Sequence, residues 1–184
     1  KTGNMVKNIA FNYNNDPSDR LMLKEINIGG IEKYSFQYNS QKLPEYISDA
    51  TDHWGHYNGT SFYASLPTNT SLSVDQLKNL LTNSYPSYKT PHLNYAKAQV
   101  LEQITYPTGG STSFEYELND YSKYGEKDIT QTLLKINNSA STKEIAGGLR
   151  ISKIKSCDEN NNCLNKTYSY LNDDGSSSGV LPYK

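Results

Sequence analysis

Residues 101–116 have the sequence LEQITYPTGGSTSFEY, which contains the pattern that indicates the fold. It begins with a Leu-x-x-Ile segment, continues through a Pro-Thr-Gly-Gly block, and ends with aromatic residues at alternate positions, Phe114 and Tyr116. Side chains of a β-strand point alternately to opposite faces, so this alternation predicts a strand with one packed face and one wet face. Proline and glycine between two such segments predict a turn. The stretch therefore predicts a β-hairpin.

The same pattern occurs three times. In residues 23–38 and again in residues 101–116, a phenylalanine follows ten residues after the isoleucine of a Leu-x-x-Ile segment. Residues 151–170 repeat the arrangement with four additional residues, which fall between the two cysteines. Residues 11–13 match the second strand of an earlier hairpin. A single hairpin is only marginally stable, so we expect neighbouring hairpins to pair in a continuous antiparallel sheet that buries the aromatic face.

One stretch departs from this alternation. Ser73 is placed as a helix N-cap with Gln76 at the capping-box position, and apolar residues follow at helical spacing. This combination predicts a short surface helix. Pro86 and Pro91 then predict an extended connection.

These patterns predict a mainly β chain, an irregular antiparallel sheet of repeated hairpins with one short helix. We expect a single β domain over residues 1–171, with hairpins near 5–38, 99–118 and 149–171 and insertions at 39–98 and 117–148. The Gly- and Ser-rich composition of residues 172–184 predicts a flexible linker to a following segment of a longer chain.

At these residues the chain resembles the Rhs/YD-repeat proteins, whose units also pair a Leu-x-x-Ile strand with a strand that carries aromatic residues. It is more similar still to the divergent YD-like region of very large exported proteins of anaerobic gut bacteria, through residues 52–59, 104–116 and 147–151. Two departures leave a closed shell and an open, irregular sheet as alternatives. Tyr-Asp pairs are missing, because Tyr38 and Tyr116 precede Asn39 and Glu117, and long insertions separate the units.

The resemblance implies an exported or cell-surface scaffold, in some members one that encloses or presents a toxin domain or binds sugars. It implies no catalytic residues in the repeat region. The expected function is therefore a non-catalytic structural segment whose partner is the remainder of its own longer chain. The alternative is a module that binds a glycan or another surface protein.

Composition and motifs exclude several classes of function. The formal charge is −1, whereas a nucleic-acid binder usually has a strongly basic domain. No apolar run approaches the roughly 18 residues of a transmembrane helix, so we expect no membrane insertion by this segment. No Ser/His/Asp set, nucleophile elbow or phosphate-cradling glycine loop is present in the sequence. We therefore expect neither an enzyme nor a cofactor.

The candidate binding site lies in residues 52–59. Trp54, His56, Tyr57 and Asn58 offer aromatic faces that stack on sugar C–H groups and an amide that hydrogen-bonds hydroxyls. The alternative is that the two larger aromatic side chains fill a gap in the core. The two histidines of the segment are spaced i and i+3, as metal ligands on a helix are, but the neighbouring glycines favour a turn. No metal site is predicted.

Cys157 and Cys163 flank a five-residue loop between two expected strands. Their spacing matches neither the CxxC redox motif nor a zinc knuckle. Opposed positions on antiparallel strands lie within disulfide range, so in an exported protein a disulfide that closes the loop is predicted, with two free thiols as the alternative.

Overall fold

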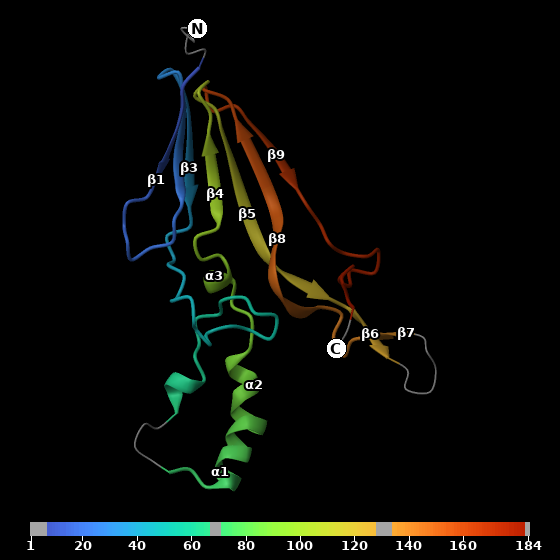
Figure 1. Ribbon diagram of the computed structural model, residues 1–184. Helices are drawn as coiled ribbons and strands as arrows, with labels where there is room; N and C mark the ends of the chain where they lie inside the picture. The colour runs from blue at the N-terminus through green and yellow to red at the C-terminus, as the bar shows by residue number, and fades with distance from the viewer. Residues whose placement is uncertain (1–6, 67–70, 128–133, 183–184) are drawn as a thin grey trace. The chain divides into compact units, whose positions relative to one another are not determined.

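The structure, a computed structural model, describes residues 7–66, 71–127 and 134–182 (Figure 1). The parts of the expected hairpins, insertions and linker that fall on other residues lie outside the described residues. Strands account for 42% of the chain and helices for 13%, which confirms a mainly β fold with a large antiparallel sheet. The strands are β1 (Ile9–Tyr13), β2 (Leu23–Ile28), β3 (Glu32–Tyr38), β4 (Leu101–Thr105), β5 (Ser111–Tyr121), β6 (Lys123–Lys127), β7 (Leu134–Asn138), β8 (Glu144–Cys157), β9 (Cys163–Thr167) and β10 (Val180–Leu181). The helical segments are η1 (Tyr63–Ser65), α1 (Val74–Asn79), η2 (Leu80–Ser84), α2 (Tyr85–Tyr88) and α3 (Leu93–Ala96).

The chain forms two compact units that interleave along the sequence. Unit 1 consists of Lys1–Leu43, Lys97–Tyr116 and Ile151–Tyr168, and unit 2 of Pro44–Ala96, Glu117–Arg150 and Ser169–Lys184. Strands β5 and β8 contribute residues to both. This differs from the single domain expected over residues 1–171, because the insertions between the hairpins build a core of their own.

Unit 1 contains the repeated hairpins, within a sheet of order β1-β2-β3-β4-β5-β8-β9 (Figure 1). Partners ten residues apart pair in the first two hairpins, Glu25 with Ser35 and Gln103 with Ser113. In the third, Lys153 pairs with Thr167, fourteen residues on. The four additional residues fall in the loop between the cysteines, so the predicted repeat spacing is confirmed.

The contact between successive hairpins also repeats. A phenylalanine on the second strand of one hairpin faces an isoleucine on the first strand of the next, Phe11 opposite Ile26 and Phe36 opposite Ile104. After each phenylalanine the register shifts by a bulge. A bulge inserts one residue and increases the local twist, so the same irregularity recurs at both junctions as a feature of the repeat.

The two bulges precede Tyr13 and Tyr38. Tyr38 and Tyr116, which hold equivalent positions in successive hairpins, make equivalent hydrogen bonds. The Tyr38 hydroxyl donates to the Leu23 carbonyl at 2.9 Å, and the Tyr116 hydroxyl donates to the Leu101 carbonyl at 2.7 Å. Both bonds link the end of a hairpin to the first residue of its own leading strand. Burial raises the pKa of both tyrosines, and for Tyr116 the Glu102 carboxylate raises it further. In the hairpins of residues 23–38 and 101–116, the tyrosine is thus a latch, a side chain that ties the second strand to the start of the first.

We predict that Tyr38→Phe and Tyr116→Phe each lower the free energy of unfolding by about 1 kcal/mol, because each removes one hydrogen bond and keeps the ring. Tyr13, the equivalent residue of β1, is 44% exposed and provides the matched control, Tyr13→Phe. Urea unfolding measures the differences. Equal stability of all three variants would show that the latch bonds contribute nothing.

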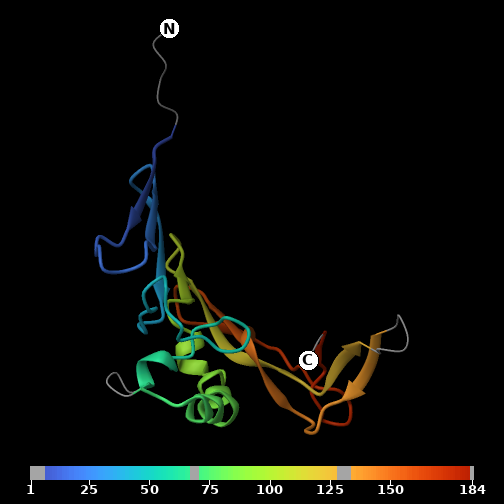
Figure 2. The same ribbon diagram turned by 60° about the horizontal axis from the view of Figure 1, so that its bottom comes forward.

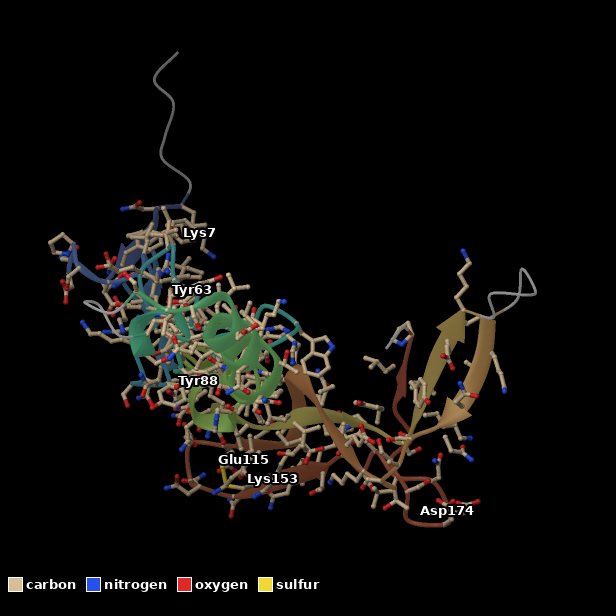
Figure 3. All side chains as sticks on the ribbon, turned by 90° about the horizontal axis from the view of Figure 1, so that it is seen from below. Lys7, Tyr63, Tyr88, Glu115, Lys153 and Asp174 are labelled. Carbon is tan, nitrogen blue, oxygen red and sulfur yellow. A yellow bond between two sulfur atoms is a disulfide. The ribbon has the colours of Figure 1, made fainter. Side chains whose placement is uncertain are left out.

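The sheet of unit 1 has one apolar and one polar face. Cross-strand partners share a face, which places Ile26, Tyr34, Phe36 and Ile104 together. The opposite face carries ion pairs such as Glu115 with Lys153 at 3.0 Å, which lie side by side in Figure 3. All regular elements among the described residues of unit 1 are strands of this sheet. The sheet was expected to bury its aromatic face, but this face is exposed on β1 and only half-buried on β2 and β3.

Unit 2 contains the expected helix. The Ser73 hydroxyl accepts from the Gln76 amide, and the Gln76 side chain accepts from the Ser73 amide, which confirms the capping box. The helical path then continues through η2 into α2 (Figure 2). Pro86 lies in the first turn of α2, so the extended connection expected at this residue is wrong.

The helical segments form an aromatic core. Phe62 is only 2% exposed, and the rings of Tyr63, Tyr85 and Tyr88 meet it edge-on, with centroids 5.0–5.6 Å away. Edge-to-face pairs at such distances add stability beyond the area they bury. This cluster is the centre of the first insertion.

Residues 172–182 differ from the expected linker. β10 pairs in parallel with β6 in a three-stranded sheet of order β10-β6-β7. Ser177 is completely buried, and its hydroxyl donates to the Asp120 carboxylate at 2.5 Å. A Cβ on Gly179 would collide with the Asp120 carbonyl. The small residues that suggested flexibility instead permit close packing.

Candidate functional site

Residues 52–59 form a turn built on the Asp52 carboxylate. Asp52 is 4% exposed, and its Oδ1 accepts from the backbone N–H groups of Trp54 and His56, both at 2.9 Å. The Asp52 N–H donates to the His56 carbonyl at 2.8 Å. One buried carboxylate therefore holds the backbone that carries both candidate side chains.

Two of the four predicted ligand residues point inward. Asn58 has no exposed surface, and its Nδ2 donates to the carbonyls of Tyr88 at 2.6 Å and Thr90 at 3.1 Å. Tyr57 packs edge-on against Tyr95, with ring centroids 5.4 Å apart. These contacts fasten the turn to the end of α2 and to α3.

Trp54 and His56 remain at the surface. Trp54 is 39% exposed and meets the His53 ring edge-on, with centroids 6.1 Å apart. A Cβ on Gly147 would lie 2.8 Å from the Trp54 Cβ. The Gly-Gly of the 147–151 motif thus leaves room for the tryptophan. The motif is visible in the sequence, but the sequence does not show that Trp54 packs against it.

The structure therefore brings Trp54, His53 and His56 together at the surface and separates them from Tyr57 and Asn58. An aromatic face beside two imidazoles can stack on a ring and hydrogen-bond its substituents. Within residues 7–66, 71–127 and 134–182, no group of three or more His, Cys, Asp or Glu side chains is arranged to hold a metal ion.

Cys157 and Cys163 are joined by a disulfide. They are direct cross-strand partners at the ends of β8 and β9, so the bond closes the third hairpin at its loop. Disulfides persist in oxidising compartments and are rare in the cytosol. The disulfide therefore encloses the loop whose four additional residues distinguish the third hairpin from the other two.

We predict that replacing both cysteines with serine lowers the free energy of unfolding by about 2 kcal/mol, the entropic value for a loop this short. Reduced wild-type protein, compared in the same urea titration, should match the double variant. Intact mass should rise by two hydrogens on reduction. Alkylation of both thiols without reductant would contradict the disulfide.

Sequence reasoning missed a buried ionic cluster in unit 2. The Asp120 side chain is 1% exposed and accepts from Arg150 at 2.8 Å, Lys143 at 3.2 Å and Ser177 at 2.5 Å. Arg150 also donates to Glu117 at 2.7 Å and stacks over the Tyr170 ring at 4.2 Å. Arg150 was visible in the 147–151 motif, but nothing local indicated its partners. Every charge in this cluster has a protein partner, as a structural network requires.

Comparison of the chain with protein-family models, with curated proteins and with solved structures finds no match in any of the three. No helix among the described residues has the length and apolar character that a membrane crossing requires.

Proposed function

We propose that this chain is a non-catalytic structural segment of a large exported or cell-surface protein of the Rhs-like kind. The observation that carries the proposal is the repeated architecture of unit 1. The same register and the same tyrosine latch recur in the hairpins of residues 23–38 and 101–116, and the same bulge recurs at the two junctions that lead into them. Repeats that bury their faces only through neighbours are building units of extended scaffolds.

Two further observations support this function. The disulfide suits an oxidising compartment, which favours export. The polar side chains of unit 2 are engaged in holding the backbone, as Asp52 and Asn58 are, or in neutralising one another, as Asp120 and Arg150 are. Side chains committed in this way favour a structural over a catalytic role.

The second candidate is a glycan- or protein-binding module centred on Trp54. It is favoured by one observation, the tryptophan that stays 39% exposed on a turn fixed by a buried carboxylate. A rigid, partly exposed aromatic side chain is what a stacking site needs.

Trp54 fluorescence tests the two functions directly, because this is the only tryptophan. The 184-residue chain is titrated with a panel of host and bacterial polysaccharides. A flat response is expected of a scaffold. A saturable shift in the wild type, together with calorimetric binding of the same polysaccharide that Trp54→Ala abolishes and Tyr46→Ala preserves, would overturn the scaffold proposal in favour of the binding module. Tyr46 is a suitable control because it is an aromatic residue of the same unit that is 87% exposed.

A further inference from the structure

A hollow of about 440 Å³ lies within unit 1, beside the disulfide and lined also by Tyr106, Thr112, Ser156 and Leu164. This volume falls within the range of small-molecule sites in proteins. The hollow shares no residue with the Trp54 turn.

Its wall is rigid. The disulfide joins the ends of β8 and β9, and Gly110 of the neighbouring hairpin turn packs against it, so that a Cβ there would lie 2.7 Å from the Cys157 carbonyl oxygen. The Asp158 carboxylate accepts from the N–H groups of Asn160 and Asn162 at 2.9 Å each and from the Asn162 side chain at 3.0 Å. A loop bonded in this way is preorganised, which lowers the entropic cost of binding.

One side of the hollow is a row of hydroxyls. The Tyr106 hydroxyl donates to Thr112 Oγ1 at 3.2 Å, and Thr112 Oγ1 and Ser156 Oγ lie 3.1 Å apart. Only one of these two hydroxyls donates to the other. The hydroxyl that accepts, whether Thr112 or Ser156, can direct its own proton to another acceptor. Each hydroxyl oxygen also has two acceptor lone pairs. The row therefore offers both a donor and acceptors to a ligand.

The rest of the lining combines the apolar side chain of Leu164 and the disulfide with the polar residues Ser111, Asp158 and Asn162. Tyr106 is braced by Tyr34, whose ring it meets edge-on at 6.2 Å, and Leu164 is 81% exposed. The only ionisable group of the lining besides Tyr106 is Asp158, whose carboxylate already has three N–H donors. These hydrogen bonds, foremost those from Asn162, lower its pKa. A ligand that fits is neutral, has one apolar face and carries hydroxyls.

We infer that this hollow binds a neutral sugar ring, with the C–H face of the ring against Tyr106 and Leu164 and its hydroxyls on Thr112 and Ser156. The site lies on the sheet of repeated hairpins in unit 1, and it depends on the Cys157–Cys163 disulfide, which forms part of its lining. It adds a ligand to a segment whose proposed role is structural.

Isothermal titration calorimetry with cellobiose and maltose tests the inference on the 184-residue chain. We expect a dissociation constant of about 1 mM for at least one of them. Leu164→Ala and Ser156→Ala should each weaken binding by about threefold to tenfold. Ile31→Ala is the matched control, since Ile31 is 90% exposed in unit 1 and lies outside the hollow. Leu164 and Ser156 are exposed, so these variants are expected to fold.

Three further results decide the matter. Reduction with dithiothreitol splits the S–S bond into two thiols while the reagent closes to its cyclic disulfide, and binding should weaken by about tenfold or more. Trp54→Ala should leave binding unchanged. Failure to bind either sugar, equal binding by both lining variants, or equal binding of cyclohexanol would overturn the inference, the last by showing a general apolar hollow.

Discussion

Replacing Asp120 with alanine is expected to lower the free energy of unfolding by about 3 kcal/mol, because it removes the buried carboxylate that Arg150 and Lys143 share and leaves Arg150 with Glu117 as its only ion-pair partner among the described residues. The carboxylate is 1% exposed and the Arg150 side chain 14% exposed, so water replaces little of the lost interaction. Ser177, fully buried, loses its acceptor in the same change. Urea unfolding followed by circular dichroism measures the difference.

Asp173→Ala is the matched control, since Asp173 is an exposed aspartate of the same unit. Its effect should remain within about 0.5 kcal/mol. A loss below about 1 kcal/mol in Asp120→Ala would show that the cluster is solvated in the folded protein and that its charges are not mutually dependent.

The same carboxylate predicts an acid dependence of stability. Burial raises the pKa of Asp120, but hydrogen bonds from Ser177, Arg150 and Lys143 lower it by more, so the net pKa lies below the ordinary 3.8. A group whose pKa falls on folding stabilises the protein above its unfolded pKa, and this contribution is lost as the pH drops through the folded pKa. Urea unfolding at stepped pH should therefore show wild type losing stability below the ordinary pKa of the group. In Asp120→Ala this part of the pH dependence should be missing.

Asn58→Ala is expected to cost about 2–3 kcal/mol, because a fully buried amide is removed from a site that water does not reach. The Thr90 carbonyl loses its Asn58 donor, whereas the Tyr88 carbonyl keeps the Thr60 hydroxyl at 2.8 Å. The Thr60 N–H loses its acceptor as well. Chemical unfolding of the variant measures the loss.

Asn94→Ala provides the control, because Asn94 is an exposed asparagine on α3 of the same unit. The comparison also separates the two roles considered for Asn58. Unchanged stability together with lost glycan binding would identify a ligand residue, whereas lost stability identifies an anchor of the turn.

Much of unit 1 could be predicted from the sequence. The register of a hairpin follows from the alternation of its side chains and the length of its loop, and both are set within ten to fourteen residues. The spacing from Ile104 to Phe114 therefore already indicates how β4 and β5 pair. The helix cap is equally local, since Ser73 and Gln76 lie three residues apart and each side chain accepts a hydrogen bond from the backbone N–H of the other. Tyr38 and Tyr116 were recognised as repeat positions, but the carbonyls that they reach depend on the bulges.

The candidate sites were less predictable. Residues 52–59 were correctly located as a turn, yet which side chains face outward depends on α2, α3 and the glycine pair at 147–148. The hollow beside the disulfide requires two hairpins to meet, so neither hairpin alone indicates it.

The repeated hairpins and the capped helix can be read from the chain alone, because period-two alternation, turn residues and caps act between near neighbours. The role of the polar residues depends instead on contacts between distant segments. Asp120, Arg150 and Ser177 lie 27 to 57 positions apart and meet only when β5, β8 and the C-terminal segment come together. Whether a charge or an amide is buried depends on the segments that surround it. The Gly- and Ser-rich composition of residues 172–182 predicted a flexible linker, but the small size of these residues instead lets them pack closely.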